Sequence, residues 1–443
     1  MAGDIERDLA AALDHHGAGR LDQAAALYER VIEAAPDHAA ALHNLGVVRA
    51  QRGDPAAAVA LFERALAARP DYPQANLNLG SALRETGRLE EAAEALGRAL
   101  ALDSGLYAAH FSRALVLAAL GRIEEAMEHF AATHAVRRAT RPPDGVSRHK
   151  LRHDVAQYRW LAAEGVEPGR FAALAEHLVT LDGRTDWPAD DDDPVALDDD
   201  DPVALDDATL AESFTAPPHV APAPALDGAV LADEFEPDAV TGAFRDDTPG
   251  IAVVDPLLSD EALAALRKSL LESTIWYDFT HIPGFVAAYL EDGLASPLLL
   301  QIAGALREAL PGVLGPHPLA QGWAFKGVAG DRPIGVHADS AAVSLNFWIT
   351  PDDAREDLKH GGLTIYTVPP PPGWTLTDYE SDSARIRDFL AGQEENRVVV
   401  PYGENRGVLF ESGLFHGSDA PRFRPGYENH RINITLLFGE RGN

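Results

Sequence analysis

A glycine recurs at a fixed interval through the first part of this 443-residue chain. The same step of 34 residues separates successive members of the series Gly19, Gly53, Gly87 and Gly121. Each glycine is followed five residues later by alanine and nine residues later by a large apolar residue. These large residues are Tyr28, Phe62, Leu96 and Phe130. Because small residues let helices approach closely and glycine suits the turn between them, the spacing predicts a solenoid of stacked helix pairs.

This pattern resembles the tetratricopeptide repeat, with four copies over about residues 5–138. The fourth copy has Arg113-Ala114 where the second and third copies have Leu-Gly, and terminal repeats often diverge in this way. Two further helical patterns, over about 149–163 and 168–181, are expected to form a helical cap on the array over 139–185. Repeat arrays of this kind present a concave groove to a peptide or protein. The resemblance therefore implies a protein or peptide partner held by the repeats.

The composition changes abruptly at residues 186–247, which contain 19 acidic residues and one basic residue. Within this segment the eight residues 190–197 are repeated at once as 198–205. Charge repulsion and proline stiffness keep such a segment extended and unpacked. The composition therefore predicts an acidic disordered linker over 186–247, followed by a C-terminal domain over 248–443.

Charge and composition disfavour several classes of function. A net charge of −32 argues against nucleic acid and anionic membrane surfaces as partners. The absence of cysteine excludes disulfides, thiolate metal ligands and a cysteine nucleophile. The N-terminus has no basic region followed by an apolar run, and no apolar stretch approaches the ~18 residues of a membrane span. We therefore expect a cytoplasmic protein without a membrane segment, and the sequence leaves its oligomeric state open.

The C-terminal domain is predicted to begin with a strand near 249–255 and two helices, about 259–273 and 295–310. Short strands separated by turn residues follow over 323–327, 341–350, 362–368, 397–401, 407–411 and 431–438. Two helices followed by short strands suit a double-sheet jelly roll with helical support. The predicted fold class is therefore multidomain: an all-α tetratricopeptide solenoid followed by an α+β double-stranded β-helix (jelly-roll) domain.

One short motif in this domain points to chemistry. His337 and Asp339 form the only His-x-Asp pair in the chain, and His416 follows in a later segment. Residues two apart in an extended segment point the same way, so the imidazole and the carboxylate can converge. Two histidines and one carboxylate on one face of a metal, with the other positions open, are the ligand set of non-haem Fe(II) oxygenases. We therefore predict that His337, Asp339 and His416 bind a metal ion.

The last predicted strand places Arg431, Asn433 and Thr435 on one face, with apolar residues between them. An arginine on the inner face of a small barrel needs an anion, because an unpaired buried charge is costly. Arginine binds carboxylates bidentately. We therefore predict that Arg431 binds one carboxylate of a dicarboxylate co-substrate whose other end chelates the metal. Arg422 and Arg424 are the alternatives for this contact. Further candidate pocket residues are Asn346, Trp348 and Tyr366.

The motif, the second histidine and the late arginine together resemble the Fe(II)/2-oxoglutarate-dependent oxygenase superfamily, in its prolyl-hydroxylase-like branch, over about residues 250–443. The resemblance implies Fe(II) held by His337, Asp339 and His416, with 2-oxoglutarate and O2 as co-substrates. It implies that Arg431 binds the C5 carboxylate of 2-oxoglutarate, with Asn433 where family members often carry a hydroxyl residue. No side chain beyond the metal ligands is expected to be catalytic.

The function that follows from both resemblances is hydroxylation of a protein or peptide substrate recruited by the repeats. Two alternatives stay open at this point. One is a small-molecule oxygenase whose repeats serve assembly, and the other is a non-catalytic repeat interaction protein.

Overall fold

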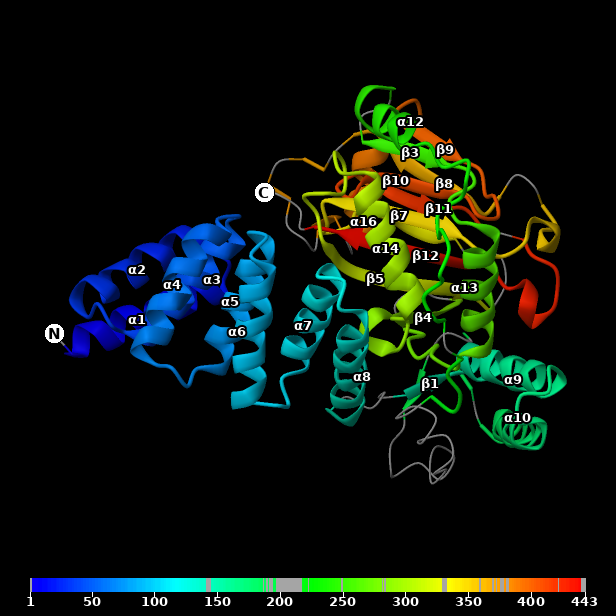
Figure 1. Cartoon of the computed structure of the whole chain (residues 1–443), viewed down its shortest axis with the longest axis horizontal. Coiled ribbons are helices and arrows are strands. Elements are labelled where there is room, and N and C mark those ends of the chain that lie inside the picture. The colour runs from blue at the N-terminus through cyan, green and yellow to red at the C-terminus, as the bar shows by residue number, and fades with distance from the viewer. Residues whose placement is uncertain are drawn as a thin grey trace. The chain divides into compact units, whose positions relative to one another are not determined.

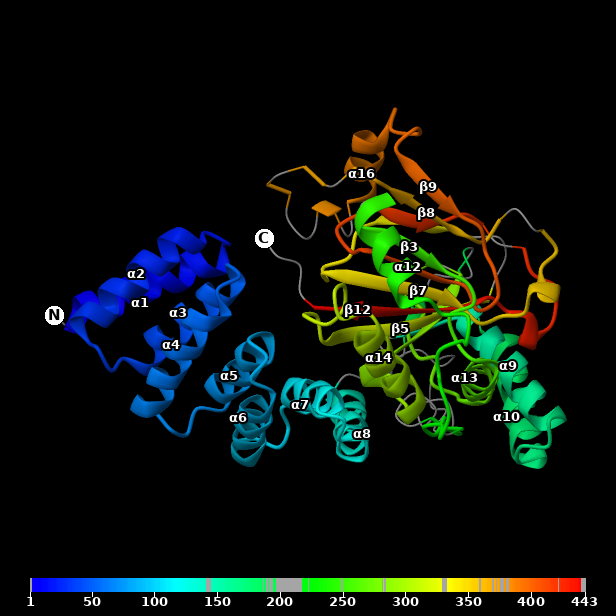
Figure 2. The same ribbon diagram turned by 45° about the horizontal axis from the view of Figure 1, so that its top comes forward.

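The protein is described by a computed structural model that covers most of the chain (Figures 1 and 2). The described residues are 2–140, 145–185, 187–188, 190, 194–196, 217–221, 223–247, 250–280, 282, 284–328, 333–357, 360–368, 370–371, 373–374, 378–379, 382–420 and 422–439. They form two compact units, the first ending at Val136 and the second beginning at Arg137.

The first unit is a series of antiparallel helix pairs, which confirms the predicted repeat array. Its helices are α1 (Ala2–Gly17), α2 (Leu21–Ala34), α3 (Ala39–Gln51), α4 (Pro55–Ala68), α5 (Pro73–Glu85), α6 (Leu89–Leu102), α7 (Tyr107–Ala119) and the start of α8 (Ile123–Thr140). The four periodic glycines each lie between the two helices of a pair, with φ between 71° and 75°. Because this left-handed conformation is strained for other residues, glycine fixes the turn of each repeat.

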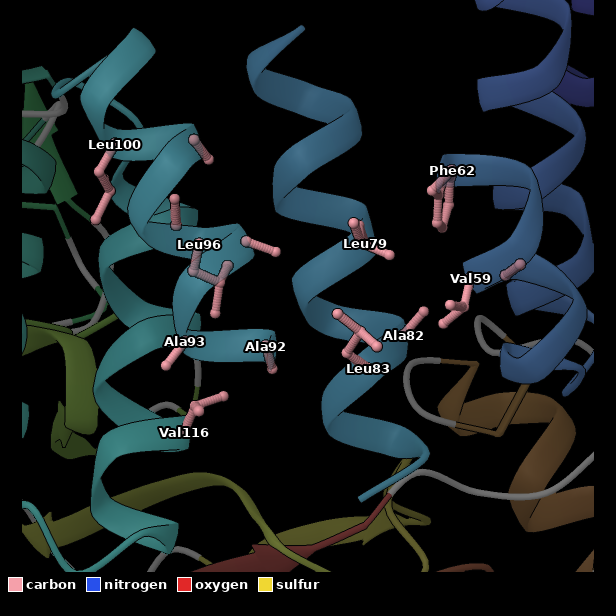
Figure 3. Close-up of a cluster of buried hydrophobic side chains, with 14 residues drawn as sticks. Val59, Phe62, Leu79, Ala82, Leu83, Ala92, Ala93, Leu96, Leu100 and Val116 are labelled. Carbon is pink, nitrogen blue, oxygen red and sulfur yellow. The ribbon is translucent and has the colours of Figure 1, made fainter. Parts of the chain in front are cut away.

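Close helix contacts form the core of this unit (Figure 3). Phe62 of α4 and Leu96 of α6 are almost fully buried and lie against the glycines of α3 and α5. A Cβ atom at Gly46 would lie 2.6 Å from the Phe62 ring, and one at Gly80 would lie 2.5 Å from Leu96 Cγ. The glycine of the Leu-Gly pair in the second and third repeats is therefore a packing requirement, since no side chain fits where the large residue enters.

We predict that Gly80→Ala destabilises the first unit. Overpacking against Leu96 costs about 1–3 kcal/mol, which outweighs the gain of about 1 kcal/mol from replacing a helical glycine. Calorimetric unfolding of the full chain measures the change. The matched control is Gly97→Ala in α6, where the nearest atom to the new Cβ is the flexible Arg113 guanidinium at 3.3 Å. Equal stability of the two variants would contradict the packing argument.

The second unit contains two antiparallel sheets. The six-stranded sheet has the order β3 (Ile251–Val254), β10 (Gly407–Glu411), β7 (Val343–Trp348), β12 (Ile432–Phe438), β5 (Leu319–Gly327) and β4 (Phe285–Tyr289). The four-stranded sheet has the order β6 (Ile334–His337), β11 (His416–Ser418), β8 (Leu363–Tyr366) and β9 (Arg397–Val400). One hydrophobic cluster takes residues from both sheets, including Trp348 and Phe410 of the larger and Ile365 of the smaller. The two sheets therefore share a core, and the predicted sheet-rich C-terminal region is confirmed.

Helices surround these sheets in the second unit. They are α9 (Arg148–Ala163), α10 (Pro168–Asp182), α12 (Pro237–Gly242), α13 (Asp260–Glu272), α14 (Pro297–Ala309) and α16 (Ser383–Leu390). Figures 1 and 2 both show α13 and α14 along the six-stranded sheet. A two-stranded ladder joins β1 (Gly145–Ser147) to β2 (Pro194–Ala196).

The expectation that residues 139–185 cap the solenoid is wrong for α9 and α10, which belong to the second unit. The Gln157 amide of α9 donates to the carbonyl oxygens of Leu271 and Ser273, at 3.1 and 2.9 Å. A ring nitrogen of His149 lies 3.2 Å from the Phe285 carbonyl oxygen of β4. The periodicity of α9 indicated a helix with a buried face. It does not indicate whether the first or the second unit covers that face.

Part of the segment predicted to be a disordered linker is also packed in the second unit. Ala221, Ala223 and Val230 are buried. The Thr274 amide donates to the His219 carbonyl oxygen at 2.9 Å, and the Leu298 amide donates to that of Ala223 at 3.0 Å. The acidic residues are concentrated before this stretch, and its Ala, Val and Leu side chains bury apolar surface. Residues 191–193 and 197–216, which include most of the duplicated block, lie outside the described residues.

A buried lysine lies between α9 and the six-stranded sheet. Lys326 of β5 is fully buried, and its Nζ is 3.3 Å from the centre of the Tyr427 ring. Among the described residues this amine has no hydrogen-bond partner, and neither has Nε2 of His153 on α9 nor Nδ1 of His430. Burial holds the pKa of Lys326 well below its ordinary value and lowers that of His153 to about 3. This basic cluster is therefore best accommodated uncharged.

Replacing Lys326 by Met should stabilise the second unit by about 1–3 kcal/mol at neutral pH, because an unpaired amine leaves the interior while the aliphatic stem is kept. An amine whose pKa is lower in the folded than in the unfolded chain binds fewer protons when folded. Wild-type stability then falls as pH decreases below about 10.4, so the advantage of the variant should be larger at pH 7 than at pH 10. Denaturant unfolding tests this, with the exposed Lys268→Met as control. A destabilised K326M variant would refute the interpretation.

Candidate metal centre

The three predicted metal ligands meet on the four-stranded sheet. His337 ends β6, and the residue directly opposite it on β11 is His416. Their ring centroids are 4.4 Å apart. Asp339 follows just after β6, with its carboxylate oxygens 3.7 Å from His337 Nε2 and 3.6 Å from His416 Nε2. In the described part of the chain, this is the one group of three or more His, Asp or Glu side chains whose ligand atoms all lie within 4.8 Å of one another.

Backbone carbonyl groups orient both imidazoles. Nδ1 of His337 lies 2.9 Å from the Gly335 carbonyl oxygen, and Nδ1 of His416 lies 3.0 Å from that of Leu414. A carbonyl oxygen only accepts hydrogen bonds, so Nδ1 carries the proton and Nε2 presents its lone pair to the centre. A hydrogen bond from the other ring nitrogen to a backbone carbonyl group fixes the tautomer of histidine metal ligands in this way.

Two serines hold the carboxylate. The Ser344 hydroxyl on β7 donates to Asp339 Oδ2 at 2.8 Å and lies 2.8 Å from the Ser412 hydroxyl. The Asp339 amide donates to the Ser412 carbonyl oxygen at 2.9 Å. Sequence reasoning missed both serines. The sequence indicates only that Ser344 lies on the same strand face as Asn346. This alternation does not distinguish a serine that donates to Asp339 from any other serine on a strand.

Burial suits His416 to metal binding. It is 5% exposed, and burial lowers its pKa to about 4, although Asp339 acts in the opposite direction. The imidazole is therefore neutral at physiological pH, and metal binding does not have to displace a proton from it.

A pocket of about 350 Å³, including its open mouth, adjoins the two histidines. The six-stranded sheet contributes four polar residues to its lining, namely Asn346 of β7 together with Arg431, Asn433 and Thr435 at β12, and the four-stranded sheet adds Ser418 of β11 beside the histidines. Its apolar lining includes Trp323, Phe325, Ile334 and Leu363. The pocket is thus formed by the inner faces of both sheets, with the predicted metal ligands on one and the predicted anion-binding residues on the other.

Arg431 is the most unusual side chain in this pocket. It is 2% exposed, and among the described residues its Nε and Nη1 atoms have no hydrogen-bond partner. Burial lowers its pKa to about 10, partly offset by Tyr402 and Asp419, so the guanidinium is still charged at neutral pH. A buried charge with free donors requires an anion. Both alternatives, Arg422 and Arg424, are exposed and do not line the pocket.

The remaining candidate residues divide between the pocket and the core. Asn346 and Asn433 line the pocket, and the Oδ1 atom of each has no hydrogen-bond partner among the described residues. Trp348 is fully buried in the cluster between the sheets. Tyr366 packs at the edge of another cluster that contains Ala338. Neither of these aromatic residues lines the pocket.

Comparisons with known proteins identify the first unit. A family profile described as tetratricopeptide repeat matches residues 9–73, 48–106 and 77–137, which confirms the repeats. Similar solved structures include MamA of AMB-1, at 29% identity over 29% of this chain and 70% of that one, with a TM-score of 0.28. MamA of MSR-1 is 28% identical over 31% of this chain and 79% of that one, with a TM-score of 0.29.

YrrB, described as a tetratricopeptide repeat protein with an unusual peptide-binding site, is 27% identical over 28% of this chain and 65% of its own, with a TM-score of 0.27. No curated protein matches the chain. None of the helices in the described ranges is both long and apolar enough to cross a membrane.

The close pairing of β6 and β11 predicts that Gly417→Ala weakens metal binding. A Cβ atom at Gly417 would lie 2.9 Å from the Ile334 carbonyl oxygen, so the strands must separate beside the His337–His416 pair. We expect at least about a tenfold loss of affinity for Co(II), measured by absorption titration. The matched control is Gly335→Ala in β6, where a Cβ meets no atom within 4 Å. Unchanged affinity in the Gly417 variant would show that strand spacing does not set the site.

Proposed function

We propose that the second unit is an Fe(II)- and 2-oxoglutarate-dependent dioxygenase with a jelly-roll fold, and that it hydroxylates a protein or peptide bound by the repeats. One observation carries the proposal: a His-Asp-His cluster and an unpaired, buried arginine share a single pocket. The cluster offers three ligands to a metal ion such as Fe(II), and the arginine offers free donors to a carboxylate such as that of 2-oxoglutarate.

The donor set suits Fe(II). Two imidazoles that present their Nε2 atoms to the centre and one carboxylate leave the other coordination positions for a chelating co-substrate and O2. His337, Asp339 and His416 would hold the metal. Fe(II) bound there would couple oxidative decarboxylation of 2-oxoglutarate to hydroxylation, with one oxygen atom of O2 ending in succinate and the other in the product hydroxyl group.

The protein supplies binding, orientation and exclusion of water. Arg431 binds the far carboxylate of 2-oxoglutarate, because its Nε and Nη1 donors are free and no carboxylate of the chain pairs with them within the described residues. The amides of Asn433 and Asn346 offer free acceptor oxygens and complete the polar side of the pocket. The serines at Asp339 keep this carboxylate in place, and aromatic side chains limit access of water.

The repeats support a role in protein interaction, since the family profile covers this part of the chain. The same observation supports the alternative that the protein is a non-catalytic interaction protein. A small-molecule oxygenase with repeats used for assembly is a third candidate. Only the first and third require metal chemistry in the second unit.

The deciding experiment is an anaerobic titration of the full chain with Fe(II) and 2-oxoglutarate, followed by admission of O2 and measurement of succinate. Wild-type protein should form a coloured complex and release succinate, and His337→Ala should do neither. If iron-loaded wild-type protein releases no succinate, even with cell extract as a substrate source, the dioxygenase proposal fails and the interaction role remains.

We also predict that Arg431→Met raises the Kd for 2-oxoglutarate at least about thirtyfold, because a charge-assisted contact worth about 2–5 kcal/mol is lost. Calorimetric titration of the Co(II)-loaded full chain measures this, and affinity for Co(II) should not change. Arg424→Met, at an exposed position outside the pocket, is the matched control. A larger effect in the Arg424 variant would reassign the anion contact.

A further inference from the structure

The face of the six-stranded sheet that lines the pocket differs in polarity from strand to strand. Directly paired residues of neighbouring strands lie on the same face of a sheet. One such row runs from Asn346 of β7 to Thr435 of β12, Trp323 of β5 and Tyr289 of β4. This face of the sheet is therefore polar at β7 and β12 and aromatic at β5 and β4, and the residues of β7, β12 and β5 in this row line the pocket.

The adjacent row repeats this change. Asn433 of β12 is paired with Phe325 of β5, which in turn is paired with Ala287 of β4. The ring centroid of Trp323 lies 6.2 Å from that of Phe325 and 6.4 Å from that of Tyr289. These residues form one apolar cluster that extends across to Ile334 on the other sheet.

Part of this apolar surface is free to contact a ligand. Trp323 and Ile334 are half-buried and both line the pocket beside His337. Among the described lining residues, the titratable side chains are His337, His416 and Arg431, and none of them lies on β5. A charged group placed against the β5 side would lose water without gaining a partner, whereas an apolar group would gain from burial.

We propose that Trp323, Phe325 and Ile334 form the floor that receives the substrate group to be oxidised, and that this group is uncharged and apolar or aromatic. The inference rests on the proposed function, because it assumes that 2-oxoglutarate occupies the polar half of the pocket at Arg431. A peptide would present such a group as a side chain.

Three fluorinated fragments with one ring and different charge test this proposal: para-fluorobenzyl alcohol, para-fluorobenzylammonium and para-fluorobenzoate. Each is titrated by fluorine NMR into the full chain loaded with Zn(II), which prevents turnover, and saturated with 2-oxoglutarate. The alcohol should bind at least about tenfold more tightly than either ion. Trp323→Ala should weaken alcohol binding at least about fivefold.

Two further variants complete the test. Ile334→Ala alters the same floor from the other sheet and should also weaken alcohol binding. Trp160→Ala removes an indole of α9 that packs on Tyr427, away from the pocket, and should have no effect. Equal binding of the three fragments, or wild-type binding in both floor variants, would overturn the assignment.

Calorimetry with 2-oxoglutarate before any fragment is added separates this inference from the proposed function. If 2-oxoglutarate does not bind, the dioxygenase proposal fails. Alcohol binding that is lost in the Trp323 variant would then still support the apolar floor. If 2-oxoglutarate binds and the alcohol does not, the substrate assignment alone fails.

Discussion

The sheet-rich unit depends on the burial of one strand on both of its faces. β12 pairs with β7 on one side and β5 on the other, and all of its residues are buried. One face carries Ile432, Ile434 and Leu436, whose burial supports the fold. The other carries Asn433 and Thr435, preceded by Arg431, which must be desolvated without an equivalent gain. The fold bears this cost at its centre, which is where a bound anion would recover it.

The local, periodic features of the molecule were predictable from sequence. The repeats follow from a fixed spacing, and the alternation after Arg431 correctly placed polar residues on one face of β12. Because the His-x-Asp motif is unique in the chain, it could be paired with a later histidine without structural information.

Features that depend on distant pairing could not be predicted. β6 and β11 are only four and three residues long, and no strand was predicted over either, so the opposition of His337 and His416 needed the sheet itself. Ser344 and Ser412 are 68 residues apart, and nothing local relates them to Asp339. The unit to which α9 belongs and the packing of residues 217–221 and 223–240 also depend on which surfaces other elements leave uncovered. Hydrophobic patterning does not encode this.

Strand β7 connects the two halves of the site. Ser344, Asn346 and Trp348 alternate along one of its faces, where they hold Asp339, line the pocket and fill the core between the sheets, respectively. A shift of one residue in the pairing of β7 would move all three to the other face. The apolar contacts of Trp348 strongly disfavour such a shift, so core packing fixes the register that the polar residues require. The same burial that stabilises the fold thereby positions the Asp339 carboxylate and the polar wall of the pocket.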